Sequence, residues 1–255
     1  MLLELSSVSR RFGGLLAVAD LWMTVEPGSI HGLIGPNGAG KSTVFNLITG
    51  VIPLTAGEIL FKRARISGLR PSEICRRGVA RTFQATALFR EYTVLQNVLI
   101  GAHLLAAPGL APALFRSRSY RERERRARGR GRALLESLGL GAVANQVAAQ
   151  LPHRDQKALA LAMALATGAE LVILDEPLAG LTAKERAETI AVLRRLREQG
   201  TTVLLVEHDM KAVMGVCDTV TVLDHGVRIA EGTPREIQAN PAVIEAYLGA
   251  EKPGA

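Results

Sequence analysis

The chain has 255 residues, 48% hydrophobic and 22% charged, which is typical of a globular protein with a sizeable core. Glu4, Ser7 and Arg10 interrupt the first apolar residues, and no run of about 18 apolar residues lacks a polar one, so neither a signal peptide nor a membrane-spanning helix is predicted. The net charge of +7 equals that of residues 116–132 alone, with nine arginines and two glutamates, so the rest of the chain is neutral and no nucleic-acid partner is expected.

The first third of the chain predicts two kinds of strand. Apolar runs around 2–10 and 17–25, together with 57–61, indicate a small antiparallel sheet. Residues 30–35 (IHGLIG) predict a buried strand, and residues 41–49 predict a helix directly after it.

Further strand-like runs alternate with helical patterns toward the end of the chain. Most of the runs are almost continuously apolar, as expected for a parallel sheet that is covered on both faces. This alternation predicts an α/β fold with a mostly parallel sheet. The predicted strands are 79–83, 171–175, 202–207 and 219–224, and the predicted helices are 183–198 and 209–216.

Between about residues 86 and 165 the strand signal disappears. A loop rich in Pro and small residues at 106–115 precedes the arginine-rich segment, and Gly139 is a predicted helix stop. We therefore expect a helical subdomain at 86–165, inserted into an α/β core formed by 1–85 and 166–255.

The arginine-rich segment, residues 116–132, predicts a helix with three possible roles. A solvated face with some Glu–Arg pairing is the favoured interpretation. Contact with an anionic lipid surface is the second, and nucleic-acid binding the third.

The strongest motif is G-x-x-x-x-G-K-[ST], which lies between a predicted strand and a predicted helix, as the motif requires. Glycines let backbone N–H groups surround phosphate oxygens, the lysine reaches the terminal phosphates, and the serine hydroxyl can ligate Mg²⁺. The motif therefore predicts binding of a nucleoside triphosphate. The candidate residues are Gly35, Pro36, Asn37, Gly38, Ala39, Gly40, Lys41, Ser42 and Thr43.

The second motif is LVILDEP (171–177), an apolar strand that ends in two carboxylates. Asp175 could hold the Mg²⁺ shell, and Glu176 could orient or deprotonate the attacking water. A strand that ends in Asp-Glu is common by itself, so the interpretation depends on the phosphate-binding motif. Gln84, His208 and Phe12 are weaker candidates, because each alone is typical of a structural residue.

Taken together, these residues resemble the ATP-binding subunits of ABC transporters over residues 3–249. GPNGAGKST resembles their Walker A loop, LVILDEP their Walker B strand, Gln84 their Q-loop glutamine and His208 their switch histidine. Phe12 lies where an aromatic residue stacks on adenine. The resemblance implies a P-loop NTPase of the RecA-like type that binds ATP and Mg²⁺.

Several segments resemble one branch of that family more closely. This branch is the longer ATP-binding subunit of importers for branched-chain, or hydrophobic, amino acids. The segments are 12–18, 80–103, 207–218 and 231–249, and the insertion at 104–132 is also similar.

The resemblance implies a dimer of ATPase subunits, arranged head to tail, on the inner face of the cell membrane. Each ATP would lie between the Walker A loop of one subunit and the signature loop of the other. Two transmembrane permease subunits would be direct partners, and an extracytoplasmic solute-binding protein an indirect one. Gln84 would sense the nucleotide, help to hold Mg²⁺ and link the site to the permease. His208 would support the γ-phosphate.

The resemblance gives the remaining roles to four residues. Lys41 and Ser42 would hold the phosphates and Mg²⁺, Asp175 would hold Mg²⁺ through water, and Glu176 would act as the base. Closure of the dimer on ATP and its reopening after hydrolysis would drive alternating access in the membrane subunits.

The signature loop departs from the family pattern, L-S-G-G-Q. Pro152 takes the place of the serine, and Arg154 that of the second glycine, where a Cβ obstructs the close approach of backbone to phosphate. Milder departures are Ala160, where glutamate is usual, and Thr182, where Asp or Asn is usual. The loop as aligned consists of Leu151, Pro152, His153, Arg154, Asp155 and Gln156.

These changes lie in the signature loop, which would contact the ATP bound by the partner subunit. The Walker A and Walker B motifs, Gln84 and His208, which would contact this chain's own ATP, match the family pattern. We therefore expect a heterodimer rather than a homodimer, with two unequal ATP sites. The guanidinium of Arg154 could alternatively bind phosphate itself.

Three alternatives remain at the level of sequence. The chain could power transport of another solute, or of lipopolysaccharide, since solute selectivity lies in other subunits. It could be an ABC ATPase that acts on DNA or ribosomes, or a regulator that binds nucleotide without hydrolysing it. Cys75 and Cys217 stand in no metal-ligand spacing, which favours a reduced, cytoplasmic protein.

Overall fold

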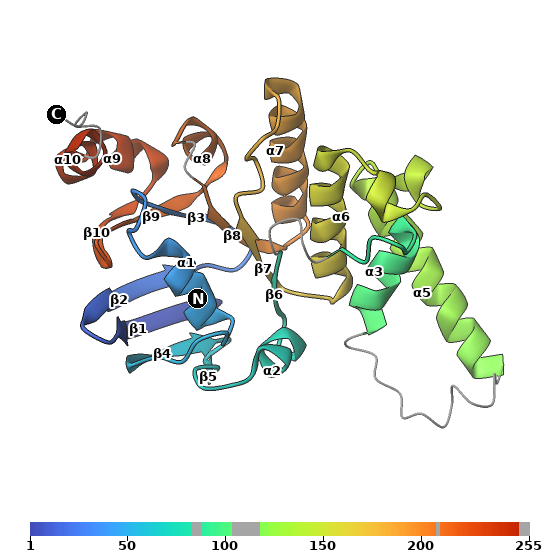
Figure 1. Cartoon of the computed structure of the whole chain (residues 1–255), viewed down its shortest axis with the longest axis horizontal. Coiled ribbons are helices and arrows are strands. Elements are labelled where there is room, and N and C mark those ends of the chain that lie inside the picture. Colours follow the sequence, from blue (N-terminus) through green and yellow to red (C-terminus); the bar gives the residue numbers. More distant parts are fainter. Residues whose placement is uncertain (83–87, 104–117, 208–209, 250–255) are drawn as a thin grey trace. The chain divides into compact units, whose positions relative to one another are not determined.

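The computed structural model describes residues 1–82, 88–103, 118–207 and 210–249 (Figure 1). The chain divides into two compact units. One consists of Met1–Arg81 and Glu170–Ala255, and the other of Thr82–Ala169. The first contains both sheets, and we call it the α/β unit; the second is the helical unit.

The α/β unit is built on a six-stranded sheet with the order β10-β9-β3-β8-β7-β6. Adjacent strands from β9 to β6 pair in parallel, and β10 is an antiparallel edge strand that the sequence did not predict. The five parallel strands match the predicted ones to within a residue or two. The bounds are β3 (Ile30–Ile34), β6 (Val79–Arg81), β7 (Leu171–Asp175), β8 (Thr202–Val206), β9 (Thr219–Asp224) and β10 (Val227–Gly232).

Helices cover both faces of this sheet, which explains why its strands are apolar at successive positions. On one face, α1 (Lys41–Ile48) packs Phe45 and Ile48 into the same core as Ile173 of β7. On the other face, Gly32 lies so close to α8 that an added Cβ would be 3.1 Å from Val213. The helices after the parallel strands are α7 (Ala183–Glu198) and α8 (Met210–Val216), followed by α9 (Pro234–Ala239) and α10 (Pro241–Gly249).

An antiparallel sheet of order β2-β1-β4-β5 shares the core of α1. Alternate residues point inward, so Leu3 and Leu5 of β1 are fully buried whereas Glu4 is not. The sheet confirms the antiparallel subdomain expected from the sequence, and the short helix α2 (Pro71–Arg76) follows it. The strands are β1 (Leu3–Phe12), β2 (Leu15–Val25), β4 (Ala56–Phe61) and β5 (Ala64–Arg65).

The helical unit contains α3 (Val94–His103), α5 (Arg118–Ser137) and α6 (His153–Ala166), with two short 3-10 helices at Gly141–Val143 and Ala148–Gln150. Gly139 follows α5 with a φ of 76° and donates its N–H to the Glu136 carbonyl, so it ends the helix as predicted.

The arginine-rich stretch of α5 faces solvent where its side chains are described. The arginines between residues 125 and 132 are exposed, and Arg128 forms an ion pair with Glu124 at 2.9 Å. This geometry agrees with the solvated helix face that the sequence favoured. Among the helices of the described ranges, none is long and apolar enough to cross a bilayer.

A polar relay, buried at His31 and Thr221, connects three neighbouring strands of the six-stranded sheet, β3, β9 and β10. His31 Nε2 lies 2.8 Å from Thr221 Oγ1, and that hydroxyl donates to Glu231 Oε2 at 2.8 Å. Because the threonine hydrogen goes to the carboxylate, the imidazole must donate through Nε2. Burial lowers the pKa of His31 from 6.5 to about 4, and Glu231 opposes this shift.

The relay predicts acid destabilisation of the α/β unit. The folded pKa of His31 lies below the unfolded value. The contribution of His31 to the free energy of unfolding is therefore fully present above pH 6.5 and decreases as the pH falls toward 4. His31 alone should remove about 3 kcal/mol of unfolding free energy by pH 4. Urea unfolding at pH 7.5 and pH 4 checks this. A His31→Gln variant should start less stable but lose less on acidification, and an equal loss in both proteins would contradict the assignment.

Candidate nucleotide-binding site

The predicted phosphate-binding loop, which we call the phosphate loop, follows β3 and adopts conformations that favour glycine. Gly35, Gly38 and Gly40 have φ values of 152°, 82° and 100°. A Cβ on Gly35 would lie 2.1 Å from the carbonyl oxygen of Leu223, and one on Gly40 would lie 2.6 Å from that of Ala17. The loop is therefore held between the two sheets with no room for side chains at these two positions.

A short chain of backbone hydrogen bonds fixes this loop to both sheets. The N–H of Gly226, in the β9–β10 turn, donates to the Ala39 carbonyl at 3.0 Å. The Gly226 carbonyl accepts from the N–H of Ala19 in β2 at 2.9 Å. The turn that carries Gly226 thus links the phosphate loop to the antiparallel sheet.

Lys41 begins α1 and extends along the inside of the loop. Its Nζ donates to the carbonyl oxygens of Gly35 and Pro36 at 2.7 and 2.8 Å. Burial lowers the pKa of Lys41, and the carboxylates of Glu176 and Asp175 oppose this shift. An ammonium at a helix N-terminus, inside a cradle of glycine backbone, matches the charge and shape of a triphosphate.

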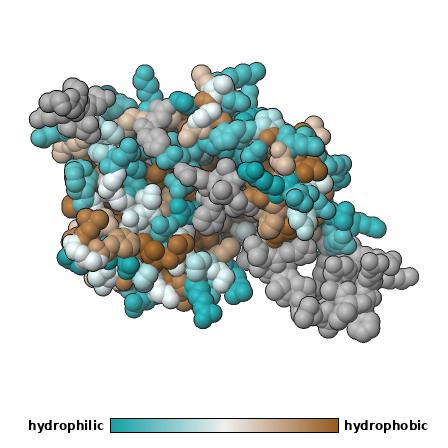
Figure 2. All heavy atoms as spheres, viewed as in Figure 1, coloured by the Kyte–Doolittle hydropathy of each residue, from teal (hydrophilic) through white to brown (hydrophobic). Residues whose placement is uncertain are grey.

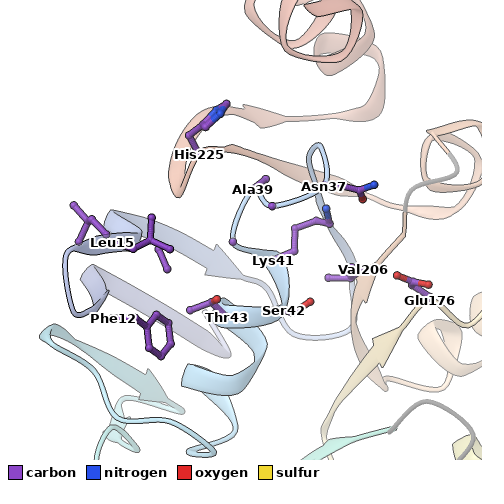
Figure 3. A pocket seen from close by; sticks show the side chains of 14 residues that line it. Phe12, Leu15, Asn37, Ala39, Lys41, Ser42, Thr43, Glu176, Val206 and His225 are labelled. Atoms are coloured by element: carbon purple, nitrogen blue, oxygen red, sulfur yellow. The ribbon is translucent and has the colours of Figure 1, made fainter. Parts of the chain in front are cut away.

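A pocket of about 470 Å³ opens over this loop (Figure 3). Apolar side chains of the antiparallel sheet lie at one end, and Glu176 lies at the other, beyond Val206. The volume and the division into an apolar and a polar end fit a nucleotide. The lining residues are Phe12, Leu15, Leu16, Ala17, Asn37, Gly38, Ala39, Gly40, Lys41, Ser42, Thr43, Glu176, Val206 and His225.

The apolar end of the pocket is exposed. Phe12 and Leu15 are 43% and 68% exposed, and the guanidinium carbon of Arg10 lies 4.4 Å from the centre of the Phe12 ring. Figure 2 shows apolar side chains gathered on the side of the antiparallel sheet, within a surface that is otherwise largely hydrophilic. An exposed aromatic ring beside the phosphate loop provides a flat surface on which a base can stack.

The predicted acidic pair lies at the end of β7. Asp175 accepts a hydrogen bond from Arg81 at 2.8 Å, and both side chains are nearly buried. Glu176 has a φ of 50°, which is uncommon for a residue with a side chain, and its N–H donates to the Val206 carbonyl at 2.9 Å. The left-handed conformation of Glu176 turns the chain out of the strand where its carboxylate lines the pocket.

Three residues near the site were missed by sequence reasoning. Arg81 pairs with Asp175, Glu207 accepts the N–H of Leu178 at 2.6 Å, and His225 lines the pocket from the β9–β10 turn. Glu207 is 1% exposed, so it holds the segment after the acidic pair from inside the core. A carboxylate directly after an apolar strand was the available signal for Glu207.

Two predicted residues, Gln84 and His208, lie outside the described residues, and their roles stay predictions. The other candidates of the two main motifs belong to the α/β unit. Phe12, the loop from Asn37 to Thr43 and Glu176 meet at one pocket, whereas Asp175 lies beside it, at the end of β7.

The loop at 151–156 belongs to the helical unit. Pro152 occupies the N-cap position of α6, and Gln156 donates its side-chain amide to the Leu151 carbonyl at 2.8 Å. Pro152 and His153 are exposed, whereas Arg154 is partly buried and pairs with Asp155 at 3.3 Å. The loop is thus an ordered start of a helix, with an arginine at the position where the family pattern has its second glycine.

Thr182, one of the milder departures, has a clear structural role. Its hydroxyl accepts the N–H of Glu185, and the Glu185 carboxylate accepts the Thr182 N–H at 2.8 Å. Threonine therefore begins α7 through a reciprocal capping box, a role that Asp or Asn also performs at an N-cap.

The ABC transporter family matches residues 18–179 of this chain. The chain belongs to this family. A second family, described as branched-chain amino acid ATP-binding cassette transporter, matches residues 227–253 of this ABC protein. Membership confirms the predicted fold class and the predicted ATPase activity, and the second match supports the narrower resemblance.

Individual ABC proteins are similar to this one over almost their whole length. The high-affinity branched-chain amino acid transport ATP-binding protein LivG of Escherichia coli is 45% identical, over 97% of this chain and 98% of LivG. BraF of Pseudomonas aeruginosa, with the same description, is 42% identical over the same shares. A nucleotide-free ATP-binding cassette of an ABC transporter superposes with a TM-score of 0.84 at 29% identity, covering 96% of this chain and 98% of that one.

The close packing around Gly35 predicts that an alanine there destabilises the protein far more than an alanine at Gly68, which lies outside the phosphate loop. Gly35→Ala should destabilise the protein by more than about 3 kcal/mol and abolish nucleotide binding, because its Cβ would overlap the Leu223 carbonyl. Gly68→Ala, at a φ of 86° with open space around it, should cost only about 1–2 kcal/mol.

Thermal unfolding and binding of a fluorescent ATP analogue check the two variants. Equal losses of stability would contradict the proposed close approach at Gly35.

Proposed function

We propose that this chain is the ATP-hydrolysing subunit that powers an importer of branched-chain amino acids. Family membership supports the ATPase, and the similarity to LivG and BraF supports the solute. The observation that carries the proposal is the pocket over the glycine loop, in which glycine backbone, an ammonium and a carboxylate surround the space for one nucleotide.

In this proposal the nucleotide lies along the pocket in Figure 3. Phe12 stacks on the adenine at the exposed end, as its position on the rim suggests. The phosphates lie over the glycine loop, where Lys41 exchanges its bonds to the Gly35 and Pro36 carbonyls for bonds to phosphate oxygens. The loop's backbone N–H groups hold the remaining oxygens.

The residues beside the loop fit a hard divalent cation such as Mg²⁺. Ser42 and Asp175 offer oxygen ligands, and Gln84 is the third ligand that the family pattern implies. When bound, Mg²⁺ would offset the charge that develops on the phosphates. The carboxylate of Asp175 is held in place by its ion pair with Arg81.

Glu176 is the proposed general base. Its carboxylate lines the pocket at the end farthest from Phe12, where a terminal phosphate would lie. There it can orient a water molecule and accept its proton during attack on the γ-phosphate. His208 follows β8 and would support the same phosphate.

The proposed assembly contains a second ATPase subunit and two transmembrane permease subunits, with an indirect link to an extracytoplasmic solute-binding protein. In this proposal the chain lies on the inner face of the cell membrane. Because Arg154 replaces a glycine in the signature loop, which would contact the partner's ATP, we propose a heterodimer with unequal ATP sites. The nucleotide in this chain's pocket then meets an intact signature loop, supplied by the partner.

The asymmetric assembly predicts the effect of removing the base. Glu176→Gln should lower ATP turnover of the whole transporter by at least about 100-fold, because general base catalysis typically contributes that much. Binding of a fluorescent ATP analogue should remain. Solute-stimulated phosphate release in reconstituted vesicles measures the loss, with the exposed Glu245→Gln as control. Turnover near wild type would show that this site does not carry hydrolysis.

The signature loop predicts a gain of activity. Arg154→Gly should raise turnover several-fold, because it lets backbone approach the partner's nucleotide. Arg154→Ala removes the guanidinium but keeps a Cβ, so it should gain less. Glycine in a helix costs about 1 kcal/mol, so the melting temperature of each variant is measured first. Steady-state hydrolysis is then compared at a temperature at which both variants are folded. Unchanged turnover in both variants would mean that Arg154 is tolerated or replaces the glycine.

A further inference from the structure

Arg81 stands out among the buried charges of the α/β unit because it contacts two different parts of the site. Its Nη1 donates to Asn46 Oδ1 at 2.6 Å, and its Nη2 donates to Asp175 Oδ2 at 2.8 Å. Its guanidinium carbon also lies 5.5 Å from the centre of the Phe45 ring. With only 10% of its side chain exposed, Arg81 is fixed between α1 and β7.

The register of the sheet explains this placement. Arg81 pairs with Ile173 across the parallel ladder of β6 and β7, so their side chains lie on the same face. Asp175, two residues after Ile173, also points to that face, which is the face covered by α1. On α1, Asn46 lies four residues after Ser42 and therefore on the same side of the helix.

We propose that Arg81 is a positioning residue that holds the Walker B carboxylate of Asp175 in a fixed place relative to α1, the helix that carries Lys41 and Ser42. This inference rests on the proposed function, because it concerns the cation that Ser42 and Asp175 would share. Arg81 acts through Asp175 and is not itself a catalytic residue.

The charges of the site show why such a residue is needed. Asp175 is 12% exposed, so water screens it poorly, and it acts electrostatically on Lys41. Without Arg81, the carboxylate would lose its fixed donor and be drawn toward the lysine ammonium, which the phosphates require. Arg81 prevents this by offering two donors in a rigid plane, one to the carboxylate and one to α1.

The test is a metal titration of the full-length chain with ADP, followed by the electron paramagnetic resonance signal of Mn²⁺. Arg81→Met should weaken Mn²⁺ binding by about tenfold, and its affinity for ADP in EDTA should change less than twofold. Arg81→Lys keeps the charge but can offer only one of the two bonds in the same geometry, so it should recover part of the loss. The control is Arg77→Met, an exposed arginine that donates to the Arg65 carbonyl.

A double-mutant cycle separates positioning from general damage. In an Asp175→Asn background, Arg81→Met should cause little further loss of Mn²⁺ affinity, because both changes remove the same interaction. Additive losses, or equal weakening of ADP binding with and without metal, would overturn the proposal. Tighter Mn²⁺ binding in Arg81→Met would also overturn it, because it would show that the guanidinium competes with the cation.

Different results of the same titration would contradict the proposed function. If the unmodified chain bound no ADP, or bound it without any metal-dependent signal, the nucleotide site itself would be wrong. If the unmodified chain bound both and Arg81→Met did too, only the role of Arg81 would be wrong. A melting temperature for each variant shows that it is folded under the conditions of the titration.

Discussion

The in-register pairing of the parallel strands is the constraint on which the site depends. Asp175 pairs with Val206, and Val206 pairs with Leu33, so β7, β8 and β3 end at the same edge of the sheet. The phosphate loop, the acidic pair and the segment after β8 therefore begin next to one another. A shift of one residue in any pair would turn Asp175 to the opposite face.

Electrostatics at this edge follow from that alignment. Lys41 and Arg81 approach the acidic pair from two sides, Lys41 from the phosphate loop and Arg81 from β6. Burial makes an unpaired charge costly, so each carboxylate or cation is stabilised by the others when no phosphate is present. Binding of a triphosphate would replace the hydrogen bonds of Lys41 to the Gly35 and Pro36 carbonyls with stronger bonds to phosphate oxygens. The ion pair between Arg81 and Asp175 would remain.

The parts of the site that depend on local sequence were the most predictable. The phosphate loop needs glycine at particular backbone angles and a lysine at the start of a helix, and all of this is contained in residues 35–43. The five parallel strands were also predictable, because burial on both faces leaves an apolar run. By contrast, the pairing of Arg81 with Asp175 joins residues 94 positions apart and depends on strand register. No local sequence pattern predicts the register between two strands.

Other features could not be predicted, for similar reasons. The edge strand β10 has no fully buried residue, and its apolar residues are interrupted by charged ones, so it lacks the apolar run of the other strands. His225 reaches the pocket only because the β9–β10 turn folds against the phosphate loop. Thr182 looked like a departure from a family pattern, but its hydroxyl performs the same capping role. Sequence motifs identify chemistry, whereas the contacts that hold this chemistry in place come from the tertiary structure.

We propose that the nucleotide bound in this chain's own pocket is hydrolysed, whereas the nucleotide of the partner, which meets the loop with Arg154, is hydrolysed weakly. The difference between the two sites can be measured by vanadate trapping of a photoreactive ATP analogue, in the transporter assembled from both ATPase subunits and the permease. After irradiation, the label should lie on this chain, with less than about a tenth as much on the partner ATPase, since a loss of about 1.4 kcal/mol already gives a tenfold difference. Equal labelling of the two subunits would show that the two ATP sites are equivalent.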